Sequence, residues 1–174
     1  MEYFTLASLE GISDEEFESL ERRVNRLLSV WEIKNLRGQA AIFHDDQHIG
    51  EKRKELKALK HPSFDVAAEF AFRGKAVVDS LEGNCLIHPL TTPVIEVNED
   101  CTKARAVWWS VGIEGLSKFR ETPMAIVSLG MVPGTHVKED GQWKILSGTW
   151  QRTAKCEYHK GWVYSMEPTN TRPP

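Results

Sequence analysis

Histidines and carboxylates are the residues of this sequence that can move protons, and His88 and Asp45 are considered as one such pair. An imidazole takes up and releases a proton near physiological pH, so His88 can serve as a general acid or base. A carboxylate that accepts a hydrogen bond from the other ring nitrogen orients the imidazole and raises its basicity, and this is the role considered for Asp45. The adjacent Asp46 is a second candidate for that role, and aspartates are also common where a helix ends.

Arg152 is considered as a cation that could act beside such a pair. A guanidinium binds a carboxylate through two hydrogen bonds, and it stabilises an enolate-like oxygen as negative charge develops. The alternative for Arg152 is a surface ion pair with Glu157, five residues along the chain.

Metal and cofactor chemistry find little support in the sequence. His44 and His48 are four residues apart and with Asp45 suggest a metal site, but the set of ligands is incomplete. No nucleophilic serine motif, glycine-rich phosphate loop or reactive dithiol pair is present. We therefore expect neither a metal nor a cofactor.

The elements that position these residues begin with helices. Ser13 and Glu16 form a capping box, and apolar residues then recur at three- and four-residue steps, which predicts a helix from residue 14. A first apolar face runs from Phe17 to Trp31 and a second from Ile33 to Phe43, with a bend considered near Trp31. A further helix is predicted over residues 50–60. We expect residues 14–60 to be mostly helical.

The rest of the chain indicates a sheet. Strands are predicted at about 85–97, 103–112, 124–138 and 142–152, with turns at 98–100, around Gly115 and at 139–141, where Asp140-Gly141 is a strong hairpin signal. A strand at 66–72 and a short helix at 75–81 are also expected. Helices followed by antiparallel strands predict an α+β fold, in which the helices cover the concave face of a curved antiparallel sheet, a cone-shaped α+β barrel.

Strand alternation places His88, Leu90 and Thr92 on one face, and if that face lines a cavity, the His88 ring reaches a bound substrate. The alternatives are a histidine whose ring is satisfied by backbone groups and one that is exposed on the outer face. Alternation also separates Trp108 from Trp109. One tryptophan of each neighbouring pair would then line the pocket while the other packs at a dimer surface.

Composition excludes several classes of function. The 174 residues suit one domain (14–166) between an arm (1–13) and a tail (167–174), and the net charge of −3 argues against a nucleic-acid partner. No apolar run is long enough to span a membrane, no secretory signal is evident, and the three cysteines lack metal-type spacing. We expect a cytoplasmic protein whose partners are a small-molecule ligand and a second copy of itself, because outward-facing Val107, Trp109 and Val111 would leave an apolar patch on a monomer.

Four segments, in order, resemble SnoaL-like proteins of the nuclear transport factor-2-like superfamily, which has a cystatin-like cone fold. Residues 33–46 are similar to the first core helix, 88–97 to the first long strand, 103–108 to the next strand and 138–145 to the closing hairpin. The resemblance covers roughly residues 30–165 and implies the fold more specifically than the activity, because the superfamily holds dehydratases, isomerases, cyclases and non-catalytic binders.

Within that superfamily the nearest pattern is that of bile-acid dehydratase-like members. The resemblance implies catalytic roles for Asp45, at the end of the first helix, for His88 and for Arg152. Two departures stand in the pocket, where a family tyrosine is replaced by Ala40 and a second aspartate by Gly112. We expect Ala40, Gly112, Trp108 and Trp150 to line the substrate site.

These observations predict a cofactor-independent acid–base enzyme acting on a small, mainly apolar cyclic molecule. The reaction would be a dehydration, an isomerisation or a cyclisation, so the enzyme would be a lyase or an isomerase that uses an Asp45–His88 dyad. The alternative is a non-catalytic small-molecule-binding or dimerisation module of the same fold.

Overall fold

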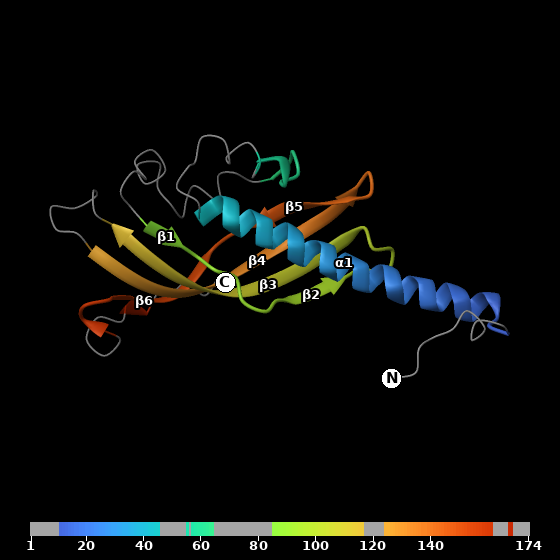
Figure 1. Cartoon of the computed structure of the whole chain (residues 1–174), viewed down its shortest axis with the longest axis horizontal. Coiled ribbons are helices and arrows are strands. Elements are labelled where there is room, and N and C mark those ends of the chain that lie inside the picture. Colours follow the sequence, from blue (N-terminus) through green and yellow to red (C-terminus); the bar gives the residue numbers. More distant parts are fainter. Residues whose placement is uncertain are drawn as a thin grey trace.

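In the described part of the chain, one long helix lies across one face of a curved, unclosed antiparallel sheet (Figure 1). The computed structural model describes residues 11–45, 55, 57–64, 85–116, 124–161 and 167–168. The predicted α+β architecture is confirmed. The expected strand at 66–72 and short helix at 75–81 lie outside the described residues, as does most of the expected helix at 50–60, of which residues 55, 57 and 58 are helical.

The helix α1 spans Asp14–Asp45, and seven strands form the sheet. The strands are β1 (Cys85–Ile87), β2 (Val94–Val97), β3 (Lys103–Leu116), β4 (Met124–Glu139), β5 (Gln142–Gly148), β6 (Gln151–Glu157) and β7 (Glu167–Pro168). The long strands β3 and β4 form the centre. β1 and β2 both pair with β3 along its free edge, β5 and β6 both pair with β4, and β7 extends the sheet from β6.

Two predicted strands are each divided in two. The expected strand at 85–97 is interrupted at residues 88–93, where Pro89 and Pro93 lack the N–H that a continuous ladder needs. The expected strand at 142–152 is interrupted at Thr149 and Trp150. The predicted alternation therefore fails beyond Leu90, and Thr92 is exposed.

The predicted turn around Gly115 is wrong, because β3 runs on to Leu116 and Gly115 pairs with Ala125 of β4. Glycine is uncommon inside strands, and this one was mistaken for a turn signal. The predicted hairpin at Asp140-Gly141 is confirmed. Both residues have positive φ, 50° and 75°, as a two-residue turn between twisted strands requires.

The capping box at the start of α1 is confirmed. The backbone N–H of Ser13 donates to Glu16 Oε2 at 3.0 Å, and the N–H of Glu16 donates to Ser13 Oγ at 3.3 Å. The second half of α1 then packs on the concave face of the sheet through one row of buried side chains: Ser29, Ile33, Leu36, Arg37 and Ala40. These positions recur at three- and four-residue steps, so they share one face of the helix.

The core lies between this row and the inner face of the sheet. The alternating residues Ala104, Ala106 and Trp108 of β3 meet Ile33, which is fully buried, and Ile145 of β5. Burial of a side chain the size of isoleucine is worth about 1.5–3 kcal/mol. None of the described helices is long and apolar enough to cross a membrane.

Candidate active site

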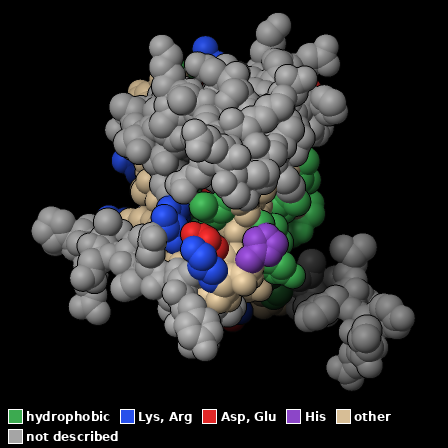
Figure 2. Space-filling view, turned by 90° about the vertical axis from the view of Figure 1, so that its left-hand side faces the viewer, with side chains coloured by type: hydrophobic (Ala, Val, Ile, Leu, Met, Phe, Trp, Pro, Cys, Tyr) green, Lys and Arg blue, Asp and Glu red, His purple; other side chains and the backbone are tan. Residues whose placement is uncertain are grey.

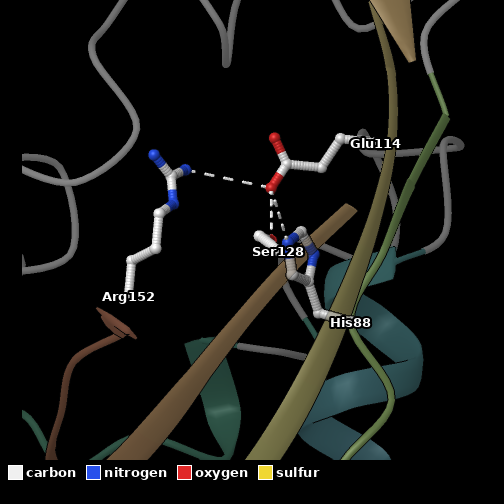
Figure 3. A network of polar contacts seen from close by, with 4 residues as sticks. All are labelled: His88, Glu114, Ser128 and Arg152. Carbon is white, nitrogen blue, oxygen red and sulfur yellow. Dashed lines mark hydrogen bonds and ion pairs between the residues drawn. The ribbon is translucent and has the colours of Figure 1, made fainter. Parts of the chain in front are cut away.

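Three polar side chains from separate parts of the chain meet at the carboxylate of Glu114 (Figure 3). His88 Nε2 lies 3.3 Å from Glu114 Oε1, and Ser128 Oγ donates a hydrogen bond to the same oxygen at 3.2 Å. The Arg152 guanidinium lies 3.9 Å from that oxygen. One carboxylate oxygen is therefore the common partner of a histidine, a hydroxyl and a cation.

The sheet register brings these residues together. Along β3, the residues from Ala104 to Glu114 at every second position face inward, and Glu114 is the last of that row. Ser128 of β4 is the direct partner of Gly112, and Arg152 of β6 is the partner of Gly130, so both lie on the same inner face. His88 follows β1 directly, and it reaches over β3 from the edge of the sheet.

Two glycines on the inner face of the sheet leave room for the rings of His88 and Trp150. A Cβ at Gly112 would lie 2.9 Å from two atoms of the His88 ring and 2.2 Å from Ser128 Oγ. A Cβ at Gly130 would lie 2.8 Å from the indole of Trp150. The His88 and Trp150 rings meet edge to face, with their centroids 5.4 Å apart. The His88 ring therefore packs on backbone that carries no side chain, and the Trp150 indole contacts its edge.

Charge and burial act in opposite directions on Glu114. Burial by itself raises the pKa of Glu114, but the hydrogen bond from His88 and the positive charges of His88 and Arg152 outweigh it, so the pKa lies below its ordinary value. An ionised carboxylate only accepts hydrogen bonds. His88 must then carry a hydrogen on Nε2, and in the neutral ring Nδ1 is the basic nitrogen.

A second buried polar group lies further along the inner face, under α1. Arg37 donates from Nε to His136 Nε2 at 3.1 Å, and its guanidinium lies 5.0 Å from the centroid of the Trp108 ring. Burial, and next to it the charge of Arg37, lowers the pKa of His136 to about 3. His136 is therefore neutral at physiological pH and accepts the hydrogen bond from Arg37.

The structure brings some of the predicted site residues together and places others apart. His88, Arg152, Gly112 and Trp150 all belong to the group around Glu114. Asp45 is the last residue of α1, and its side chain, like all of Asp46, lies outside the described part, so the Asp45–His88 dyad stays a prediction.

The other two expected pocket residues, Ala40 and Trp108, are buried in the core beneath α1. An ion pair was considered between Arg152 and Glu157. In the structure Arg152 approaches Glu114, and Glu157 forms an ion pair with Lys160 at 2.8 Å.

Two residues of this site were missed in the sequence, Glu114 and Ser128. The signal for Glu114 was present, because two further residues of alternation beyond Gly112 place a glutamate on the buried face. Ending the predicted strand at Gly112 hid it. Ser128 carried no signal of its own, since only the pairing register sets it opposite Gly112.

Within the described ranges, no group of three or more histidine, cysteine, aspartate or glutamate side chains is arranged to hold a metal ion. His44 and His48, the histidines considered for a metal, lie outside the residues whose side chains are described. What the described arrangement offers chemically is proton transfer and the stabilisation of negative charge.

The surface near this end of the sheet differs from the opposite end. Viewed from the side at which β3 ends and β4 begins, a histidine is exposed beside acidic and basic side chains, and hydrophobic side chains gather along one flank (Figure 2). At the other end, an open hollow of about 670 Å³ lies between α1 and the loops that follow β2 and β4. The ion pair between Glu32 and Lys138, at 3.1 Å, contributes to its lining. None of the residues that line this hollow is a histidine.

Solved structures of the same shape exist. A protein provisionally assigned as a scytalone dehydratase, from Novosphingobium aromaticivorans, superposes with a TM-score of 0.58 at 21% identity, covering 87% of this chain and 99% of its own. A protein of the same organism described as NTF2-like, with a cystatin-like fold, gives 0.53 at 16%, covering 79% and 90%. The chain has the NTF2-like, cystatin-like fold. A Kribbella flavida protein, Kfla4162, aligns with a TM-score of 0.57 at 14% identity, covering 75% and 94%.

The resemblance read from the sequence thus agrees with the neighbours of the NTF2-like fold. Sequence comparison adds nothing to it, since neither a family model nor a curated protein matches the chain. Identities of this size establish the fold and leave the chemistry to be argued from the residues.

Proposed function

We propose that the protein is a cofactor-independent acid–base enzyme that acts on a small, mainly apolar cyclic molecule. His88 is the group that moves the proton, Glu114 holds its ring, and Arg152 stabilises negative charge. The observation that carries the proposal is the convergence of His88, Ser128 and Arg152 on one buried oxygen of Glu114.

The step that this geometry supports is removal of a proton next to a carbonyl group. Nδ1 of His88 is shielded from solvent in this structure, so the neighbouring side chains must move to admit the substrate. Nδ1 then takes the C–H proton, and the electron pair moves to the carbonyl oxygen, where the guanidinium of Arg152 stabilises it. In a dehydration the pair then returns to form the double bond as hydroxide leaves, and the protonated His88 gives it the proton that makes water. Proton transfer of this kind contributes about 10²–10⁴-fold to the rate.

The surroundings of His88 favour an apolar ring as the ligand. Trp150 lies at the edge of the imidazole, and the glycines at 112 and 130 are covered by the rings of His88 and Trp150, so an indole stands beside the reacting group. Apolar surface with few placed polar groups is typical of small-molecule sites. One neighbour of the same fold is provisionally assigned as a dehydratase, which supports the lyase class.

A substrate-independent reaction tests the proposal. A base in an apolar site opens nitrobenzisoxazole by taking its ring C–H proton, whereupon the N–O bond breaks and a coloured cyanophenolate forms. We expect His88→Gln to lower this rate by about 10²-fold or more, whereas His159→Gln, at an exposed histidine, leaves it unchanged. Equal rates in the wild type and in His88→Gln would contradict the acid–base role and favour a non-catalytic binding module.

The proposal includes a homodimer formed through the outer face of the sheet. Trp109 is 50% exposed and Ile113 52% exposed, on the side of β3 that faces away from α1, with Val111 between them. Ile87 of β1 pairs with Ile113 and is also exposed, whereas Val107 is partly buried. A second copy placed against this strip would remove the apolar patch from water.

A further inference from the structure

The first half of α1 carries an apolar face that the sheet does not use. Every residue from 11 to 28 is exposed, and in Figure 1 this half of the helix continues beyond the edge of the sheet. Five large apolar side chains nevertheless recur along it and just beyond it at alternating steps of three and four residues: Phe17, Leu20, Val24, Leu27 and Trp31. Leu27 is 70% and Trp31 64% exposed. We call these five residues the α1 stripe.

The α1 stripe points away from the sheet. Successive residues of an α-helix are rotated by about 100°, so the stripe is centred roughly opposite the buried row that contains Ile33, Leu36 and Ala40. A rotation of the helix on its own sheet could bury one row only by exposing the other. The stripe therefore needs a partner that approaches from the outside.

The spacing of the stripe is that of a coiled-coil seam, in which apolar residues at steps of three and four pack into a facing helix. A helical segment of this length without packing is only marginally stable in water, so contact along the stripe would also stabilise the helix. We propose that the α1 stripe is a self-association surface, on which the α1 helix of a second copy of this chain packs.

The charges beside the stripe select the direction. In a parallel pair, Glu16 of one helix would lie beside Glu21 of the other, and like charges would meet twice. An antiparallel pair that stacks Leu20 on the second copy's Trp31 and Val24 on its Leu27 avoids this conflict. It sets Glu21 beside the second copy's Leu28 and Arg23 beside its Val30, so no like charges face each other.

The antiparallel arrangement is also sterically open. Each sheet lies on the side of its own helix opposite the stripe, so the two bodies project away from each other. The surface is separate from the outer strip around Trp109, because α1 lies on the other face of the sheet. The two contacts can form independently.

The molar mass in solution tests the α1 pair. In a Trp109→Glu/Ile113→Glu background, which removes the outer sheet strip, we expect light scattering at micromolar concentration to report a dimer. Adding Leu20→Glu and Leu27→Glu should convert it to a monomer. The matched control, Ser19→Glu/Asn25→Glu, adds the same charge to the exposed helix beside the stripe and should keep the dimer. A background variant that is monomeric, for instance because the chain's own first ten residues cover the stripe, would overturn the proposal.

The direction is tested by oxidation of cysteine variants. Mixing Leu20→Cys protein with Trp31→Cys protein should give the mixed disulfide between positions 20 and 31, as identified by peptide mass spectrometry. Disulfides formed mainly between two copies of Leu20→Cys would show a parallel pair and contradict the antiparallel arrangement.

Discussion

Gly112 lies directly beneath the ring of His88, so close that a Cβ on residue 112 would come within 2.9 Å of ring atoms Cδ2 and Nε2. The imidazole can therefore occupy this position because residue 112 has no side chain, and the Glu114 carboxylate contacts the ring from one side. Both constraints come from β3, the central strand, whose residues 112 and 114 are neighbours on one face. The location of the candidate base therefore depends on this strand.

We expect Gly112→Ala to displace the His88 ring and Ser128. Forcing a methyl group into this space should cost about 1–3 kcal/mol of stability, and a displacement near 1 Å should lower the rate of nitrobenzisoxazole opening by about 10²-fold. The measurement is that rate together with the free energy of unfolding. Gly38→Ala is the matched control, because a Cβ there meets nothing within 4 Å and α1 should become about 0.5–1 kcal/mol more stable. A fully active Gly112→Ala variant would mean that the ring position does not matter.

The buried His136 predicts a dependence of stability on pH. Because its pKa is lowered to about 3 in the folded protein, the folded state keeps this ring neutral while the unfolded chain protonates it below about pH 6.5. The stabilisation is complete above about pH 6.5 and is lost as the pH falls toward about 3, by roughly 1.4 kcal/mol per pH unit.

Denaturant unfolding at a series of pH values measures this loss. His136→Gln keeps an acceptor for Arg37 but does not titrate, so its stability should fall less steeply over the same pH range. His159→Gln, at an exposed histidine, should retain the slope of the wild type. Parallel slopes for the wild type and His136→Gln would contradict the assignment of the loss to His136.

The outer sheet strip predicts a second change in molar mass. Trp109→Glu places a charge at the centre of the proposed sheet-to-sheet contact, so this contact should no longer form at micromolar concentration. Sedimentation equilibrium should then report a lower molar mass than for the wild type. Gln142→Glu, on the exposed hairpin, adds the same charge elsewhere and should change nothing. The homodimer through the sheet is excluded if both variants have the molar mass of the wild type.

Local signals in the sequence predicted the local structure well. The Ser13–Glu16 capping box and the Asp140-Gly141 hairpin each depend on a few neighbouring residues, and both are present as predicted. The order of helix and strands sufficed for the fold class, because amphipathic helices before a run of strands have few other ways to bury their apolar faces.

The features that could not be predicted depend on distant parts of the chain. Periodicity showed that Phe17 to Trp31 form one face of a helix but not that this face turns away from the sheet. Glu114 and Ser128 meet only through the pairing of β3 with β4, which is a matter of register. The break at residues 88–93 allows His88 to reach across β3, and a strand pattern drawn through its prolines concealed that break.

The account rests on His88 being a base whose ring is held by an ionised Glu114. Two-bond ¹H–¹⁵N correlation spectra of the imidazoles, assigned with His88→Gln, measure this directly in mildly alkaline solution. We predict that neutral His88 carries its hydrogen on Nε2, with a proton resonance shifted downfield by the carboxylate. That resonance should move upfield in Glu114→Gln and stay in place in the control Glu96→Gln, at an exposed glutamate. A hydrogen on Nδ1 that responds to Asp45→Asn and not to Glu114→Gln would contradict the account and give the orienting role to Asp45.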